Sequence, residues 1–226
     1  MSARGWFMVV LATALSLLAG CSTAPKGMDY TAFIAARPAS IVVLPPLNES
    51  PDVNATPSVL AQSTAPLAES GYYVVPVGVM MEAFRQNGLT EPHDIHEVSR
   101  SKLRQIFGAD AALYITVTDY GTQYTVFDSV ARVSARAVLV DLRSGQTLWS
   151  GSATAHNNEG RNNSNQGLLG AVIGAVVRQV INAVTDAAHP VAGITANRLL
   201  HAGRQDGILW GPRAPLYGQD TPAPLR

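Results

Sequence analysis

The chain has 226 residues, with 16 basic and 16 acidic side chains, and 47% of its residues are hydrophobic. Charged residues make up 14% of it, well below the roughly 25% of an average soluble protein. A neutral chain without a cationic run has no electrostatic footprint for nucleic acid, so we expect no nucleic-acid partner. A surface this poor in charge favours a partner protein or a position beside a membrane.

The first twenty residues have the pattern of an export signal. Arg4 supplies a positive charge, and Trp6–Ala19 is apolar apart from Thr13 and Ser16. This run is shorter than the roughly 20 helical residues that a bilayer core needs. We therefore expect residues 1–20 to be a signal peptide rather than a stable membrane span.

The apolar run ends in Leu18, Ala19, Gly20 and Cys21. This quartet resembles the bacterial lipobox, in which the cysteine sulfur receives a diacylglycerol, the signal is cut before the cysteine, and the new amino group is acylated. One acyl chain binds a bilayer only marginally, so a stable anchor needs more than one. We expect Cys21 to carry these chains, palmitate among them. The alternative is a cysteine that is lost with the signal peptide.

The cysteine content and the residue after Cys21 indicate where the protein lies in the cell and which cofactors it can carry. Cys21 is the only cysteine, so the rest of the chain can form neither a disulfide nor a thiolate metal site. Ser22 follows it instead of aspartate, which by analogy with enterobacterial sorting indicates the outer membrane. We expect a periplasmic body held by outer-membrane lipid, with surface exposure as the alternative, and no cofactor besides the diacylglycerol and the N-acyl chain.

The first part of the body predicts a β-α-β unit. Residues 21–38 are small and polar and predict a lipidated tether. The continuous apolar run 41–44 predicts a strand covered on both faces. A helix is expected over 56–71, kinked or restarted at Pro66 because proline lacks the backbone donor. A second apolar strand over 72–77 then completes a unit with parallel strands.

The rest of the body predicts a mixed sheet. Apolar spacing and turn residues predict, in chain order, a helix over 80–86, a helix over 94–107 closed by Gly108, a strand over 113–118, strands over 133–142 and 147–154, a helix over 191–200 and an edge strand over 208–210. The short glycine-containing link between the two long strands indicates a hairpin. We expect a single three-layer-like α/β domain over 39–217, with a mixed sheet flanked by helices, and a flexible tail over 218–226.

The stretch from Gly167 to Ala187 predicts a helix with two unlike faces. One face is bulky and aliphatic, and the other is small or polar, with Gly167, Gly170, Gly174, Arg178 and Asn182. The spacing of Gly170 and Gly174 permits close helix approach. One interpretation is a core helix with a narrow exposed face. The other is an interaction face for a subunit or the membrane.

The densest polar cluster contains His93 and His96, with Asp94 and Glu97 beside them. Two imidazoles three residues apart on a helix could share one metal ion. The cluster also coincides with a predicted helix start, where the exposed amides favour acidic side chains. We favour the helix-start interpretation and expect no metal.

Catalytic motifs are absent from the sequence. It contains no Gly-x-Ser-x-Gly, no His-Glu-x-x-His, and no glycine-rich loop with a Walker A lysine. We therefore expect a protein that is not an enzyme. The alternative is a periplasmic metal-binding protein or hydrolase that uses the His93 and His96 cluster.

Several segments carry a family resemblance: IVVLPP at 41–46 with Asn48, Glu49 and Ser50 after it, ESGYYVVPV at 69–77, IFGADAALYITV at 106–117 and DLRSGQTLWSG at 141–151. From about Ala39 to Tyr217 the chain resembles outer-membrane lipoproteins of proteobacteria of unknown function, of the neisserial genome-derived antigen type. The resemblance implies an α/β fold related to the TolB N-terminal domain and to CsgG, the secretion-channel lipoprotein.

The same resemblance implies a function without catalysis. The chain would be an interaction or assembly component of an envelope complex, forming an oligomer or hetero-complex with other envelope lipoproteins. A CsgG-like protein is among the implied partners.

Overall fold

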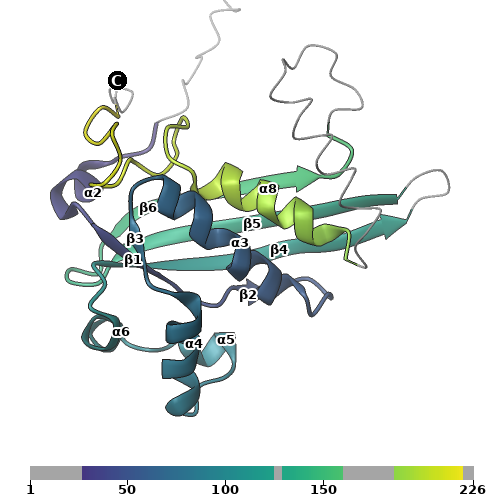
Figure 1. Ribbon diagram of the computed structural model, residues 1–226, viewed down its shortest axis with the longest axis horizontal. Helices are drawn as coiled ribbons and strands as arrows, with labels where there is room; N and C mark the ends of the chain where they lie inside the picture. Colours follow the sequence, from purple (N-terminus) through teal and green to yellow (C-terminus); the bar gives the residue numbers. More distant parts are fainter. Residues whose placement is uncertain (1–26, 125–128, 160–185, 221–226) are drawn as a thin grey trace, which may run out of the picture. The chain divides into compact units, whose positions relative to one another are not determined.

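The computed structural model describes residues 27–124, 129–159 and 186–220, and those from Met28 onward belong to one compact unit (Figure 1). Its strands are β1 (Ser40–Val43), β2 (Leu47–Asn48), β3 (Tyr73–Val74), β4 (Ala111–Tyr124), β5 (Ser129–Asp141) and β6 (Thr147–His156). Its helices are α2 (Thr31–Ala36), α3 (Ala55–Glu69), α4 (Val77–Gln86), α5 (Pro92–His96), α6 (Arg100–Phe107) and α8 (Ala188–Leu200).

The strands of the described residues form one mixed sheet in the order β3-β1-β4-β5-β6, and β2 pairs with β4 beside this path. β1 runs parallel to both β3 and β4, whereas β5 runs antiparallel to β4 and β6. The predicted mixed sheet, the parallel β-α-β unit and the hairpin of β5 and β6 are all confirmed. Helices flank this sheet, as expected for the α/β class.

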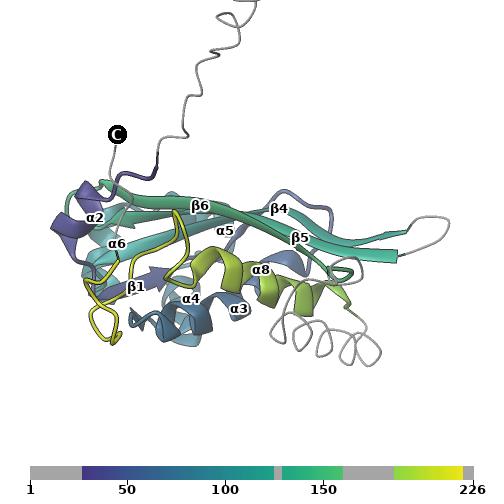
Figure 2. The same cartoon turned by 90° about the horizontal axis from the view of Figure 1, so that it is seen from above.

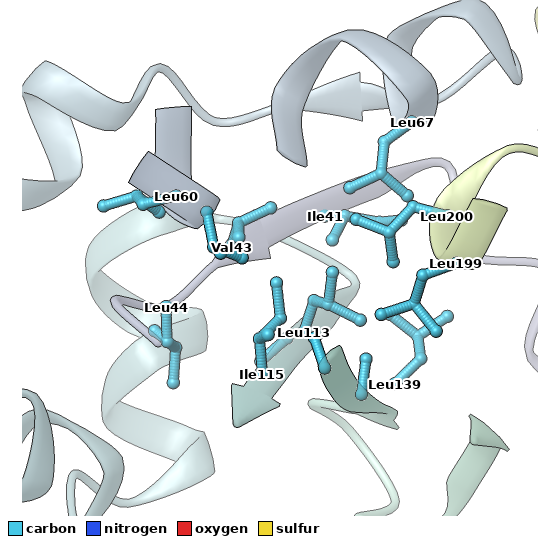
Figure 3. Packing of buried hydrophobic residues seen from close by; sticks show 14 of the residues in the cluster. Ile41, Val43, Leu44, Leu60, Leu67, Leu113, Ile115, Leu139, Leu199 and Leu200 are labelled. Carbon is cyan, nitrogen blue, oxygen red and sulfur yellow. The ribbon is translucent and has the colours of Figure 1, made fainter. Parts of the chain in front are cut away.

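Helices α3 and α8 lie side by side against one face of the sheet (Figure 2). The strand residues that point toward them are buried and apolar, and Figure 3 shows Ile41, Leu113 and Leu139 meeting Leu67 of α3 and Leu199 of α8. Along β4, Leu113, Ile115 and Val117 are fully buried while the residues between them are more exposed. This alternation is the one that the sequence predicted.

Two prolines lie inside helices. α3 continues through Pro66, which corrects the predicted restart, whereas the predicted kink at Pro66 stays a prediction. Pro66 stands in the last turns of the helix, and the ladder resumes where the amide of Ser70 donates to the Pro66 carbonyl at 3.1 Å. Pro190 lies in the first turn of α8, where amides have no acceptor within the helix. Pro190 therefore costs α8 little, whereas Pro66 leaves the Gln62 carbonyl without the helical amide donor that another residue would supply.

The predicted helix over 94–107 is two helices, α5 and α6. The chain leaves the helical path at Ser99, whose side chain accepts a hydrogen bond from the Lys102 amide at 3.4 Å and caps α6. Gly108 closes α6 in the left-handed region at φ 63°, as predicted. The helical spacing of apolar residues continues across this break, so the sequence predicted one helix. The helix-capping role of Ser99 was not predicted.

Helix α2 corrects the predicted tether, since residues from Met28 onward belong to the body. Tyr30 and Phe33 are 7% and 4% exposed, and the Tyr30 hydroxyl donates to the Gly207 carbonyl at 2.5 Å. The amide of Met28 donates to the Asp206 carboxylate at 3.1 Å. The two buried aromatic side chains hold residues 28–38 against the body, although the small and polar composition of this segment is typical of a linker.

The predicted edge strand over 208–210 is also wrong, because these residues have no ladder partner in the described chain. Single hydrogen bonds hold the segment instead, from the Tyr72 hydroxyl to the Leu209 carbonyl at 2.5 Å and from the Gly211 amide to the Ser70 carbonyl at 2.8 Å. We call residues 207–220 the C-terminal segment.

In the described ranges, 27–124, 129–159 and 186–220, no helix has both the length and the apolar character to cross a membrane.

Candidate functional site

The predicted lipidation and interaction residues lie outside the described residues. They are Leu18, Ala19, Gly20 and Cys21 of the lipobox, and Gly167, Gly170, Gly174, Arg178 and Asn182 of the predicted interaction face. The body would limit the geometry of an anchor at Cys21, because Met28 is only seven positions after Cys21. A fully extended chain spans about 3.3–3.6 Å per residue, so this link reaches about 25 Å at most.

The predicted metal candidates His93 and His96 do not come together around a site. The His96 ring packs edge-on against Tyr114, and its Nε2 lies 2.9 Å from the Pro45 carbonyl oxygen. Burial lowers the pKa of His96, which the Pro45 contact opposes. The His93 ring is exposed, with Asp94 4.0 Å away. Among the described residues no group of three or more metal-ligating side chains is present.

His96 instead lines an open polar cavity of about 400 Å³ between α5, α6 and the turn that joins β5 and β6. Arg100 and Arg143 contribute guanidinium groups, and Arg143 is paired with Asp110 at 2.5 Å. The Arg100 guanidinium lies against Gly145, where an added Cβ would be 1.1 Å from Nη1. The cavity walls come from three separate segments, so no local motif indicated it.

A second hollow lies between α2 and the C-terminal segment and has a volume of about 310 Å³. We call it the apolar groove. Its lining is mostly apolar and aromatic: Phe33, Ile34, Arg37, Pro38, Leu209, Trp210, Tyr217, Gly218 and Asp220. Asp220 is tied to the backbone, since it accepts from the Trp210 amide at 2.8 Å.

The packing of the C-terminal segment on the body depends on two glycines. Gly71 has φ +91°, and a Cβ added there would lie 2.4 Å from the backbone nitrogen of Ala214. A Cβ at Gly211 would lie 2.6 Å from the Gly71 carbonyl oxygen. Only residues without a side chain permit this approach, which brings the C-terminal segment against the end of α3.

Large apolar side chains are exposed along the apolar groove. Ile34 is 52% exposed, Leu216 45% and Tyr217 44%. Ile34 and Tyr217 line the groove itself, and Leu216 directly precedes Tyr217. Exposed apolar side chains gathered at a hollow are typical of a contact surface.

A serine and a histidine meet between α3 and α8. The Ser58 hydroxyl oxygen lies 2.7 Å from Nδ1 of His189, and Nε2 of that ring lies 3.0 Å from the Gln62 amide nitrogen. With Gln62 donating to Nε2, the ring proton is on Nδ1 and is donated to Ser58. These two contacts link α3 to α8.

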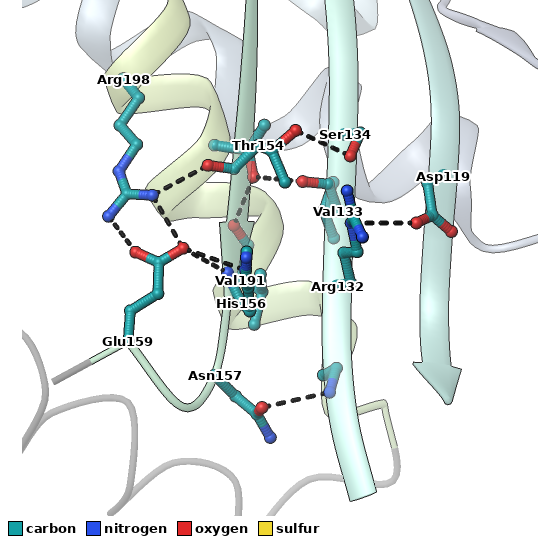
Figure 4. A network of polar contacts seen from close by, with 12 residues as sticks. Asp119, Arg132, Val133, Ser134, Thr154, His156, Asn157, Glu159, Val191 and Arg198 are labelled. Carbon is teal, nitrogen blue, oxygen red and sulfur yellow. Dashed lines mark hydrogen bonds and ion pairs between the residues drawn. The ribbon is translucent and has the colours of Figure 1, made fainter. Parts of the chain in front are cut away.

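The polar network at the end of β6 also consists of internal contacts (Figure 4). Arg198 donates to both carboxylate oxygens of Glu159 and, at 2.8 Å, to the Thr154 carbonyl. Burial alone would raise the pKa of Glu159, but hydrogen bonds from Arg198 and from the His156 amide lower it overall. On β4 and β5, Arg132 pairs with Asp119 at 3.3 Å.

The described residues thus define an α/β body with a polar and an apolar surface hollow. The chain belongs to the family described as "Putative lipoprotein GNA1162-like", whose model matches residues 28–213. The match begins where the compact body begins. The family resemblance predicted from the sequence is confirmed, whereas the relation to the TolB N-terminal domain and CsgG stays a prediction.

A neisserial protein sequence and a neisserial crystal structure are similar over most of the chain. "Putative lipoprotein NMB1124/NMB1162" of Neisseria meningitidis serogroup B is 56% identical over 203 residues, which are 90% of this chain and 94% of that protein. The crystal structure of lipoprotein GNA1162 from Neisseria meningitidis has a TM-score of 0.52 at 61% identity, covering 65% of this chain and all of that one.

A more distant likeness concerns the fold only. PelC from Paraburkholderia phytofirmans, solved as a dodecamer, has a TM-score of 0.41 at 15% identity, covering 72% of this chain and 86% of that one.

Proposed function

We propose that this protein is a lipid-anchored lipoprotein of the outer membrane, and that its periplasmic body is a non-catalytic interaction or assembly component of an envelope complex. Cys21 carries the diacylglycerol and the N-acyl chain. The partners are other envelope lipoproteins, with a CsgG-like protein among them, in an oligomer or hetero-complex.

The observation that carries this proposal is the short distance along the chain between Cys21 and the folded body. Packing of Tyr30 and Phe33 reduces the predicted tether to the six residues between Cys21 and Met28. A body held this close to its anchor works at the membrane surface rather than at a distance from it. Membership in a lipoprotein family supports the same assignment.

The polar clusters of the described residues support a function without chemistry on a substrate. Ser58 and His189 bond to each other within a helix contact, and His96 contacts a backbone carbonyl. Arg198 and Glu159 neutralise each other. The apolar groove, with its exposed Ile34 and Tyr217, has the character of a contact surface rather than of a reaction site.

Anchoring is tested by labelling cells with radioactive palmitate and separating their membranes. The wild-type chain is expected to incorporate label and to sediment with the outer membrane, and Cys21→Ala to do neither. Ser22→Asp serves as a matched control, since it should keep the label and change only the membrane in which the protein is found. An unlabelled wild-type chain, or a Cys21→Ala chain that is equally membrane-bound, would refute the anchor.

Assembly is tested separately, by chemical crosslinking in intact envelopes followed by gentle detergent extraction and size measurement. A species larger than the monomer is expected, with at least one envelope lipoprotein in it. A strictly monomeric wild-type chain under these conditions would contradict the assembly part of the proposal and leave the anchor standing.

A further inference from the structure

We propose that the surface formed by α2 and the C-terminal segment lies against the bilayer, and that the apolar groove takes in lipid acyl chains from it. The inference rests on the proposed lipidation of Cys21. It adds an orientation for the body and names the partner of the apolar groove, a phospholipid surface.

The first argument is the reach of the link. Met28 is fixed to the body by its amide hydrogen bond to Asp206, and α2 begins three residues later, at Thr31. The seven positions from Cys21 to Met28 span about 25 Å at most, so Met28 lies no farther than that from an acylated cysteine at the lipid surface. The part of the body nearest to the anchor along the chain is therefore held within reach of the lipid headgroups.

The second argument is the chemistry of that part. Ile34, Leu216 and Tyr217 are about half exposed, and their apolar area would be removed from water in the outer part of a bilayer. Trp210 and Tyr217 line the apolar groove, and such amphipathic rings are enriched at the level of the headgroups. Arg37 lines it as well and can bury its aliphatic stem while its charge stays among the phosphates.

The third argument is that the covalent lipid already attaches the body to the membrane. The contact between the body and the bilayer therefore needs no strongly cationic surface. The chain is neutral overall, so binding by electrostatic attraction alone is not expected. The covalent lipid would supply the attachment, and the apolar contact would only orient an already attached body. Asp220, the carboxyl of the groove, is engaged by the Trp210 amide, and burial raises its pKa.

The test uses the full lipidated chain in vesicles of phosphatidylethanolamine and phosphatidylglycerol. The sulfur of Cys21 is blocked by its lipid, so a single engineered cysteine can be labelled with bimane. Ile34→Cys places the label at the apolar groove. Val53→Cys is the matched control, because Val53 is 83% exposed and belongs to the connection between β2 and α3, far from α2 (Figure 1).

Vesicles that contain doxyl-labelled phospholipid report contact with acyl chains directly. Bimane at position 34 is expected to be quenched at least threefold more than bimane at position 53. Equal quenching at both positions overturns the inference. Protection of position 34 from water-soluble quenchers without quenching by doxyl lipid also overturns it, since a second copy or another protein then covers the groove.

The same experiment separates this inference from the proposed anchor. If Cys21→Ala chains bind the vesicles as well as lipidated chains do, the anchor fails. If lipidated chains bind and position 34 is not quenched, the anchor holds and the orientation is wrong. A circular dichroism spectrum of each variant, expected to equal that of the wild type, shows that Ile34→Cys has not unfolded the body.

Discussion

The hydroxyl oxygen of Ser58 on α3 lies 2.7 Å from the imidazole nitrogen Nδ1 of His189 on α8, across 131 positions of sequence. Both ring nitrogens are engaged, because Gln62 of α3 contacts Nε2. The two helices that cover one face of the sheet are therefore joined by a polar link as well as by apolar packing. Ser58 is only 6% exposed, so this link is shielded from water.

Ser58→Ala is expected to lower the free energy of unfolding by about 1 kcal/mol, because it leaves a ring nitrogen of His189 without its partner. Urea unfolding followed by circular dichroism measures the change. Ser150→Ala, at an exposed position of β6, is the control and should be within about 0.5 kcal/mol of the wild type. If Ser58 were a nucleophile, a fluorophosphonate probe would label it, and we expect no labelling.

Gly71→Ala should be more damaging than an alanine at another glycine of similar backbone conformation. Gly88 also has positive φ, at +75°, but nothing lies within 4 Å of its added Cβ, whereas at Gly71 the Ala214 nitrogen is 2.4 Å away. Gly88→Ala is expected to cost about 1 kcal/mol, from the strained backbone alone. Gly71→Ala adds an overpacking cost of about 1–3 kcal/mol, because the C-terminal segment must move.

Thermal unfolding of these two variants compares the costs directly. The melting temperature of Gly71→Ala is expected to fall clearly below that of Gly88→Ala. Equal melting temperatures would show that the C-terminal segment does not press on Gly71. The C-terminal segment, which forms one wall of the apolar groove, would then not be held in place by its contact with Gly71.

Most strands and helices of this fold were predictable, because the pattern of apolar residues within each segment indicates its secondary structure. The run 41–44, the alternation from Leu113 to Val117, and the hairpin over 133–154 each depend on neighbours in sequence. The exceptions depend on partners far away. α2 is fixed by Tyr30 reaching Gly207, 177 positions later, and no local pattern carries that information.

The candidate site was less predictable for the same reason. The apolar groove joins residues 33–38 to residues 209–220, and the C-terminal segment also approaches the end of α3 closely where Gly71 admits Ala214. His93 and His96, adjacent enough in sequence to suggest a shared ligand, have different environments, since one is exposed and the other packs on Tyr114. Spacing alone could not show which ring faces the sheet.

The Glu159 and Arg198 pair predicts a pH dependence of stability. The hydrogen bonds of the folded state depress the pKa of Glu159 below its ordinary value, so its stabilising contribution is present above the unfolded pKa and is lost as pH falls through the folded one. Glu159→Gln is expected to cost about 1 kcal/mol at pH 7. The difference from wild type should shrink steadily below about pH 4.5.

Urea midpoints measured at several pH values between 7 and 3 follow this difference. A double-mutant cycle with Arg198→Gln isolates the pair, because in the absence of the guanidinium the Glu159→Gln change should lose most of its pH dependence. A pH profile unaltered by Arg198→Gln would mean that the amide of His156, which donates to Glu159 at 2.8 Å, sets the carboxyl pKa by itself.

The glycine face predicted over Gly167 to Ala187 lies outside the described residues and stays a prediction, with two interpretations that a substitution separates. Leucine at both Gly170 and Gly174 would fill the space that a close helix approach needs. If the face is a contact with another subunit or protein, the crosslinked complex should weaken at least tenfold, while the urea midpoint of the isolated body stays unchanged. If the helix is part of the core, the unfolding midpoint itself should fall, because overpacking costs about 1–3 kcal/mol.

Alanine at the same two positions is the control, since it adds one methyl group at each position and should keep the association. A double leucine variant with wild-type association and wild-type stability would remove both interpretations and leave the face without a packing role.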